Sequence, residues 1–179
     1  TPQMLKQEAY WLKKIQSLDS PLELPTDRAR PSLKTYNGAR LSSEVDEELY
    51  NSLQTFSSKK KCTSFMVLFA AFNVLLHRIT GQNKFNVGIA FAGRTLSESE
   101  ELVGYCSNIY PVQSHLDSDM TIDSYLVKLK NELLDAYDNQ DYSFAKLISK
   151  AGNLSNKSRP HFFSVAFNWD RVVVPEMYG

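Results

Sequence analysis

The sequence predicts a layered α/β sandwich in which helices pack on a mixed β-sheet. Apolar residues recur at helical spacing in some segments and alternate with period two in others, and the two kinds of segment follow one another along the chain. The chain has 179 residues, of which 42% are hydrophobic, and this is enough to build one core. We therefore expect residues 1–179 to form one compact unit.

The first part of the chain combines a helix with an extended connector. Apolar residues recur at helical spacing from Leu5 to Leu18, and Pro21 and Pro25 prevent the helix from continuing. The connector from Leu24 to Pro31 contains two prolines and three charged residues, which predicts an extended segment on the surface. Tyr36 to Leu41 is expected to form a short strand.

Two helices are expected next. The first has apolar residues on one face, at Val45, Leu49, Leu53 and Phe56. The second runs from Ser64 to Thr80, with Thr63 as its N-cap and Gly81 at its end. Because this second helix is apolar nearly all round, we expect it to be buried on most sides.

Three segments are expected to form the sheet. From Phe85 to Phe91 large apolar residues alternate with small or polar ones, which predicts a strand whose second face lets another segment pack closely. Ile109 to Leu116 predicts a further strand. The continuous apolar and aromatic run from Phe162 to Phe167 predicts a central strand.

Two more helices separate the last two strands. Ile122 to Tyr137 carries apolar residues at helical spacing, and Thr121 precedes it as the N-cap. Met120 is placed to pack against Tyr125 as a hydrophobic staple. Phe144 to Ile148 predicts a short helix.

Charge and cysteine content argue against several classes of function. Basic and acidic residues number 20 each, so a nucleic-acid partner is not expected. Cys62 and Cys106 are the only cysteines and form no CxxC motif, which argues against a disulfide framework or a metal site and favours the reducing cytoplasm. The most apolar run, Phe65 to Leu76, is too short to span a membrane, so no membrane partner is expected.

Five separated segments carry the motifs of one known family, in the order in which that family has them. They are Tyr10-Trp11-Leu12 with Leu22 to Pro31, Gly81 to Arg94, Val103 to Asn108, Asn139 to Phe144, and Ser158-Arg159 with Phe162 to Asn168. The family that they resemble is the condensation domain of nonribosomal peptide synthetases, in which the third segment is similar to the GxFVN motif and the fifth to the SRNPLFxVxFN segment. The resemblance covers nearly the whole chain, from Tyr10 to Asn168.

This resemblance implies a fold like that of chloramphenicol acetyltransferase, with two lobes, of which residues 1–179 would be the C-terminal one. The HHxxxDG motif of the family's N-terminal lobe is missing, since His77, His115 and His161 are isolated. The resemblance therefore implies no catalytic residue in this chain, a catalytic histidine on the other lobe, and no activity of this chain alone.

Five residues receive expected roles from the resemblance. Gly104, Tyr105, Ser107 and Asn108 would line the substrate tunnel, and Arg94 would brace the other lobe by pairing with the Asp of HHxxxDG. Alternatives stay open, because Asn is common in turns and a single arginine after a glycine is often an ordinary surface residue.

Gly88 also has two interpretations, as a packing residue or as a substrate contact. Asn139 to Phe144 is interpreted as scaffold, where one helix ends and another begins.

The function implied by the resemblance is amide-bond formation between a donor acyl or peptidyl thioester and an acceptor aminoacyl thioester. Both substrates would be carried on the phosphopantetheine of carrier proteins, with no cofactor bound by this chain. The expected partners are the N-terminal condensation lobe, donor and acceptor peptidyl carrier proteins and an adjacent adenylation domain. Cys106, Ser107 and Gln113 depart from the family pattern and leave the substrate class open.

Two other functions stay open at this point. One is a non-catalytic module that docks with a carrier protein or a neighbouring domain. The other is a stand-alone acyltransferase of the same superfamily that works as an oligomer and draws its histidine from a neighbour, although no HxxxD motif is present. Cyclisation and epimerisation remain open as variants of the parent reaction.

Overall fold

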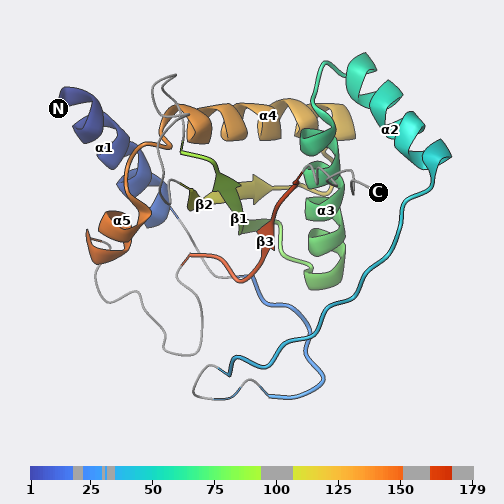
Figure 1. Cartoon of the computed structure of the whole chain (residues 1–179), viewed down its shortest axis with the longest axis horizontal. Helices are drawn as coiled ribbons and strands as arrows, with labels where there is room; N and C mark the ends of the chain where they lie inside the picture. Colours follow the sequence, from blue (N-terminus) through green and yellow to red (C-terminus); the bar gives the residue numbers. More distant parts are fainter. Residues whose placement is uncertain (18–21, 30, 32–34, 94–106, 151–161, 171–179) are drawn as a thin grey trace, which may run out of the picture.

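The computed structural model describes residues 1–17, 22–29, 31, 35–93, 107–150 and 162–170 (Figure 1). The predicted alternation of helices and strands is only partly confirmed, because three described helices come before the first two strands, and two more come before the last strand. In order they are α1 (Pro2–Gln16), α2 (Glu47–Lys59), α3 (Ser64–Thr80), β1 (Lys84–Phe91), β2 (Asn108–His115), α4 (Ile122–Asp138), α5 (Phe144–Lys150) and β3 (Ala166–Phe167).

The described strands form a mixed sheet in the order β2-β1-β3. β1 and β2 are antiparallel along their whole length, from Lys84 opposite His115 to Phe91 opposite Asn108. β3 runs parallel to β1 and pairs with it only at Gly88 and Ile89. The predicted α/β class with a mixed sheet is confirmed.

Helices α3 and α4 cover one face of the sheet. In Figure 1, α4 runs across the top of the strands and α3 lies beside β3. The rings of Phe69 and Phe72 in α3 lie 5.4 Å from the ring of Phe167 in β3. Tyr125 of α4 shares a buried hydrogen bond of 2.7 Å with Ser114 of β2. Helices and sheet therefore enclose the main core between them.

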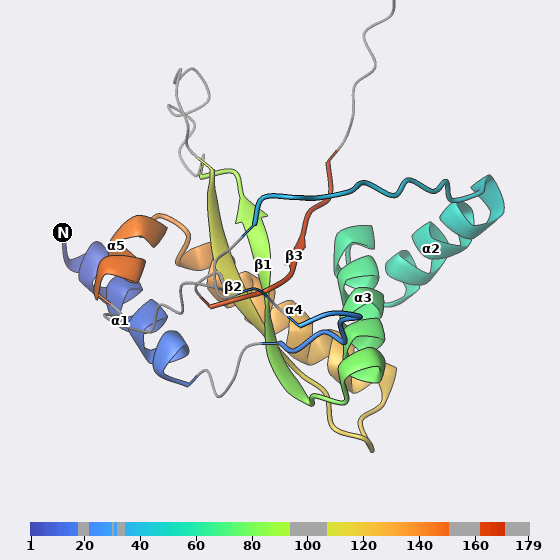
Figure 2. The same ribbon diagram turned by 90° about the horizontal axis from the view of Figure 1, so that it is seen from below.

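Helix α1 packs at the other end of α4, away from α2, as Figure 2 shows from below. The indole ring of Trp11 is 1% exposed and stacks on the ring of Tyr110 at 4.5 Å. Its Nε1 donates a hydrogen bond of 2.7 Å to the carbonyl oxygen of Asn139. Asn139 caps the end of α4 and Phe144 begins α5, as predicted for residues 139–144.

The predicted bounds of α3 are confirmed at both ends. The Thr63 hydroxyl accepts a hydrogen bond from the backbone N–H of Met66, and Gly81 ends the helix with a φ of +69°. Burial on most sides is confirmed, because the exposed residues of α3 form a single stripe that includes Leu75 and Ile79, at 51% and 48% exposure. The other positions of this helix are buried or partly buried by the described part of the chain.

Two predicted strands differ in the structure. Tyr36 to Leu41 is extended but does not belong to the three-stranded sheet, and both terminal residues of the segment are exposed. An extended segment is a β-strand of a sheet only where another backbone pairs with it. Of Phe162 to Phe167 only the last two residues are strand, and among the described strands they lie at an edge and not at the centre. Phe162 itself has a φ of +70°, which is not an extended conformation.

No single described helix has the length and hydropathy of a membrane span, and the one combination that meets the criterion joins α2 and α3, which are bent by 104° at their junction.

Candidate functional site: the open end of the sheet

Two of the five predicted site residues lie within the described structure. Asn108 is the first residue of β2 and is partly buried, and Ser107 precedes it and is exposed. Arg94, Gly104 and Tyr105 lie outside the described residues. The site must therefore be built from Asn108 and its neighbours.

Asn108 lies opposite Phe91, the last residue of β1. Residues directly opposite in an antiparallel pair direct their side chains to the same face of the sheet. Tyr110, two residues further along β2, shares that face. The rings of Phe91 and Tyr110 are in edge contact at 5.8 Å. Asn108 thus begins a row of side chains that continues into an aromatic cluster.

Within the described part of the chain, no strand pairs with the other edge of β1 at this end. Among the described residues, β3 pairs with β1 no further than Ile89, and Asn168 to Asp170 continue as exposed coil. The last residues of β1 extend beyond this pairing. A pocket of about 310 Å³ lies beside them, which we call the strand-end pocket.

Three elements line the strand-end pocket. They are the first turn of α3, the end of β1 and the C-terminal half of α4. The lining residues are Phe65, Met66, Ile89, Ala90, Phe91, Ala92, Leu133, Leu134, Tyr137 and Gln140. None of them is charged, and only Tyr137 and Gln140 carry polar side-chain groups.

Local structure holds the lining residues in place. The N-cap at Thr63 orders the first turn of α3, which contains Phe65 and Met66. Gln140 is 3% exposed, and its side-chain Nε2 donates a hydrogen bond of 2.9 Å to the carbonyl oxygen of Tyr137. The carbonyl oxygen of Gln140 accepts a hydrogen bond of 2.9 Å from the Tyr110 hydroxyl.

Tyr110 connects the pocket to the rest of the core. Its one hydroxyl hydrogen is shared between the carbonyl oxygens of Gln140 and Tyr142. Burial, with a smaller contribution from the charge of Asp141, raises the pKa of the Tyr110 phenol well above its ordinary value. The phenol therefore stays protonated at neutral pH and remains a hydrogen-bond donor.

The histidines have other partners. Nδ1 of His77 lies 3.0 Å from the carbonyl oxygen of Gln82, which agrees with its predicted structural role. Nε2 of His115 lies 3.0 Å from Oδ1 of Asp117 on the surface. His161 is outside the described residues.

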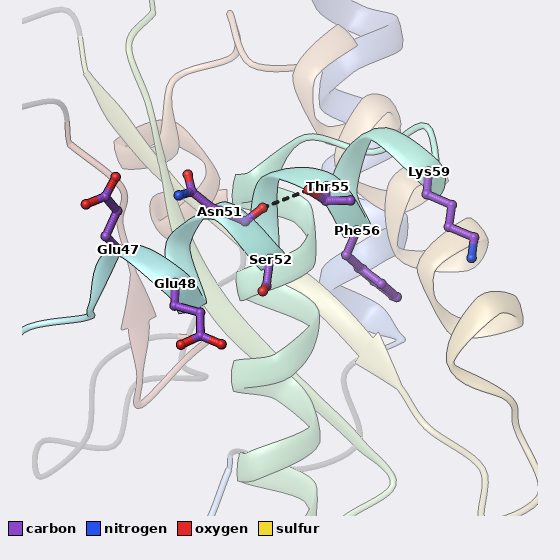
Figure 3. Close-up of a pocket in the computed structure, with 7 residues that line it drawn as sticks. All are labelled: Glu47, Glu48, Asn51, Ser52, Thr55, Phe56 and Lys59. Carbon is purple, nitrogen blue, oxygen red and sulfur yellow. Dashed lines mark hydrogen bonds between the residues drawn. The ribbon is translucent and has the colours of Figure 1, made fainter.

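A wider hollow of about 730 Å³ lies on α2 (Figure 3). Its lining residues all come from that one helix and are Glu47, Glu48, Asn51, Ser52, Thr55, Phe56 and Lys59. The one hydrogen bond drawn in Figure 3, of 2.9 Å, joins the Thr55 hydroxyl to the carbonyl oxygen of Asn51, one turn earlier in the same helix. A single helix face does not surround a ligand, and we do not treat it as the site.

Sequence reasoning missed the strand-end pocket. Leu133 and Tyr137 share the predicted apolar face of one helix, but Tyr137 is 55% exposed and forms part of the rim. No local pattern distinguishes an apolar residue beside a pocket from one beside another side chain. The small residues Ala90 and Ala92 on the second face of β1, where the sequence predicts close approach of another segment, were the one available signal.

Comparison with known proteins places the chain in a family. The condensation domain family matches residues 1–174. Gramicidin S synthase 2 of Brevibacillus brevis is 35% identical over 169 residues, and tyrocidine synthase 2 of Brevibacillus parabrevis is 33% identical over 162 residues. These alignments cover 93% and 90% of this chain but only 4% of each of the two relatives.

Solved structures show the same fold. A four-domain nonribosomal peptide synthetase, holo-AB3403, matches with a TM-score of 0.88 and 19% identity over 93% of this chain and 13% of its own. The X-domain from teicoplanin biosynthesis matches with a TM-score of 0.82 and 20% identity over 91% of this chain and 36% of its own. The fold expected from the resemblance is confirmed, and the chain belongs to the condensation domain family.

Proposed function

We propose that this chain is the C-terminal lobe of a condensation domain that forms amide bonds in nonribosomal peptide synthesis. The observation that carries the proposal is the family match over residues 1–174. The match to the first condensation domain of the CDA synthetase covers 94% of this chain but only 35% of that one, which supports the one-lobe assignment.

The proposed reaction joins two thioesters. The amine of the acceptor aminoacyl group attacks the carbonyl carbon of the donor thioester, the C–N bond forms, and the C–S bond breaks to release the phosphopantetheine thiol of the donor carrier protein. The amine loses a proton, which we assign to a histidine of the N-terminal lobe. Holding both reactants in one tunnel supplies much of the rate enhancement.

In this proposal the open end of the sheet is one wall of the tunnel. Asn108 orients a thioester or amine through its side-chain amide, and Gly104, Tyr105 and Ser107 line the wall beside it. Arg94 braces the N-terminal lobe. The position of Asn108 at the start of β2, opposite Phe91 of the strand-end pocket, supports this arrangement.

An exposed apolar strip supports a second lobe. It follows the extended segment before α2 and continues along that helix, through Tyr36, Leu41, Val45, Leu49, Tyr50 and Phe56. Large apolar side chains that are exposed along one stretch of chain are candidates for an interaction site. We assign it to contact with the N-terminal lobe, with carrier proteins and an adenylation domain as the further partners.

The free thiol of Cys62 supports a reducing location, the cytoplasm.

The decisive experiment combines the two lobes. This chain, alone and mixed with the N-terminal lobe of a related condensation domain, is incubated with donor and acceptor carrier proteins loaded with aminoacyl groups, and dipeptidyl product is followed by mass spectrometry. We expect product only in the mixture. Product from this chain alone would place the base within it and contradict the proposal, and carrier binding without product in either sample would favour a docking module.

The same assay tests Asn108. We expect Asn108→Ala to lower the rate of product formation by about tenfold or more, because a misplaced reactant loses the benefit of alignment. Asn131→Ala, at an exposed position of α4 that does not line the strand-end pocket, is the matched control and should keep the full rate. A full rate with Asn108→Ala would remove Asn108 from the proposed tunnel.

A further inference from the structure

The strand-end pocket has the form of a binding site and not of a packing defect. Its floor consists of buried residues, among them Ile89 at 3% and Leu133 at 6% exposure. Its rim includes Leu134 and Tyr137, which are 46% and 55% exposed. An empty apolar hollow with an accessible rim leaves apolar surface exposed to water, which is unfavourable unless a ligand fills the hollow.

The chemistry of the lining selects a neutral, apolar ligand group. A charged group in this pocket would lose its hydration without meeting an opposite charge, because no lining residue is charged. The phenol of Tyr137 and the amide of Gln140 are the only polar side-chain groups. Ligand pockets are typically built in this way, mostly from apolar side chains with a few polar groups.

The volume limits the size of that group. The pocket holds about 310 Å³. An apolar cavity of about 150 Å³ is enough to bind benzene. A branched or aromatic amino-acid side chain, or a medium-length acyl chain, therefore fits, and a folded segment of another protein does not.

The position relates the pocket to the proposed tunnel. Phe91 lines the pocket and lies opposite Asn108 in the β1–β2 register. Directly opposite residues in an antiparallel pair have Cβ atoms about 5 Å apart. The side group of a thioester substrate that lies beside Asn108 can therefore reach the pocket.

We propose that the strand-end pocket binds the hydrocarbon side group of the acyl or aminoacyl thioester that the condensation domain uses. This inference rests on the proposed function and adds to it the place and the chemical class of one substrate group. The pocket then selects among substrates by apolar size and rejects charged side chains.

Direct binding tests the inference without any turnover. The full 179-residue chain is titrated, by calorimetry or ligand-observed NMR, with N-acetylcysteamine thioesters of acetyl, butanoyl, hexanoyl and octanoyl groups. Affinity should rise by about fourfold for each methylene until the pocket is full. Leucyl and aspartyl thioesters form the aminoacyl arm, in which leucyl should bind and aspartyl should not. The affinities of the octanoyl and leucyl thioesters, compared with each other, show whether the pocket prefers an acyl chain or an amino-acid side chain.

Two matched variants on α4 locate the binding. Leu134→Glu places a charge at the rim and should weaken octanoyl binding by about tenfold or more. Val127→Glu is the control, since Val127 is 62% exposed on the same helix and does not line the pocket. It should leave affinity unchanged. Circular dichroism checks that both variants fold, and Tyr137→Glu replaces Leu134→Glu if that variant does not.

The contradicting results are distinct. Affinity that is independent of chain length, or that is equal in the Leu134→Glu and Val127→Glu variants, would overturn the pocket assignment even if the two-lobe assay gives product. Thioester binding in the pocket, combined with no product from the two lobes, would instead overturn the proposed function. The assignment of the ligand as a condensation substrate would then fall as well, and only the conclusion that the pocket binds neutral hydrocarbon groups would stand. Loss of binding to the N-terminal lobe in Leu134→Glu, with thioester binding intact, would show that the rim belongs to the lobe interface and overturn the inference.

Discussion

Gly88 determines how closely a second segment approaches the sheet. A Cβ atom at this position would lie 2.6 to 2.9 Å from three ring carbons of Phe163. The backbone N–H of Gly88 donates to the carbonyl oxygen of Val165, and the Asn86 side chain donates to the carbonyl oxygen of Phe162. Of the two interpretations of Gly88, the structure supports close packing.

The cost of filling that space can be measured. Gly88→Ala should lower the free energy of unfolding by about 1 to 3 kcal/mol, because the Phe163 ring must move away from an already filled site. Gly38→Ala is the matched control, since nothing lies within 4 Å of a Cβ there, and it should change stability by less than about 0.5 kcal/mol. Urea denaturation compares the two. Equal midpoints would mean that the Phe163 contact contributes nothing.

At the scale of elements, the helix starts follow local chemistry. Thr63, Thr121 and Asp46 precede α3, α4 and α2, and each side chain accepts a hydrogen bond from a backbone N–H three residues ahead. These contacts lie within one turn of chain. The N-caps at Thr63 and Thr121 were for this reason predictable from sequence.

The cap at Thr63 also supports the strand-end pocket, because Phe65 and Met66 lie in the first turn of α3. Thr63→Ala should lower the free energy of unfolding by about 1 kcal/mol through loss of the bond to the Met66 N–H. Thr55→Ala, inside α2, should be neutral or slightly stabilising because alanine favours helix. Thermal unfolding followed by circular dichroism checks both, and equal losses would refute the capping role.

The short β3 is an element-scale result that local patterns could not supply. The run from Phe162 to Phe167 has the composition of a buried strand, yet Phe162 turns the chain and Phe163 packs across Gly88. Only Ala166 and Phe167 remain to pair with β1. Within the described part of the chain, the strand-end pocket lies beside residues of β1 that extend beyond this pairing.

At the scale of the whole molecule, α2 and the segment before it stand apart from the core. Figures 1 and 2 both show α2 extending from the body of the chain beside α3. Among the described residues, the exposed apolar strip ends there at Leu49, Tyr50 and Phe56. A chain that exposes such a strip is expected to cover it by association.

Self-association should therefore depend on α2. We expect this chain alone to form dimers or larger species as its concentration rises, and Leu49→Glu to shift that equilibrium towards monomer. Thr55→Glu adds the same charge at an exposed polar position of the same helix and should have a smaller effect. Analytical ultracentrifugation separates these outcomes. A monomer at every concentration would show that the strip does not drive association.

The sequence by itself determined the α/β class, the positions of α1, α3, α4, β1 and β2, and the family resemblance. It did so because helix periodicity, strand alternation and N-caps act over a few residues. Only the tertiary structure decided that Tyr36 to Leu41 stays outside the sheet, that β3 is a short edge strand, and that a pocket opens beside Asn108 and Phe91. Strand pairing and cavities depend on which distant segments meet, and no local pattern of side chains contains that information.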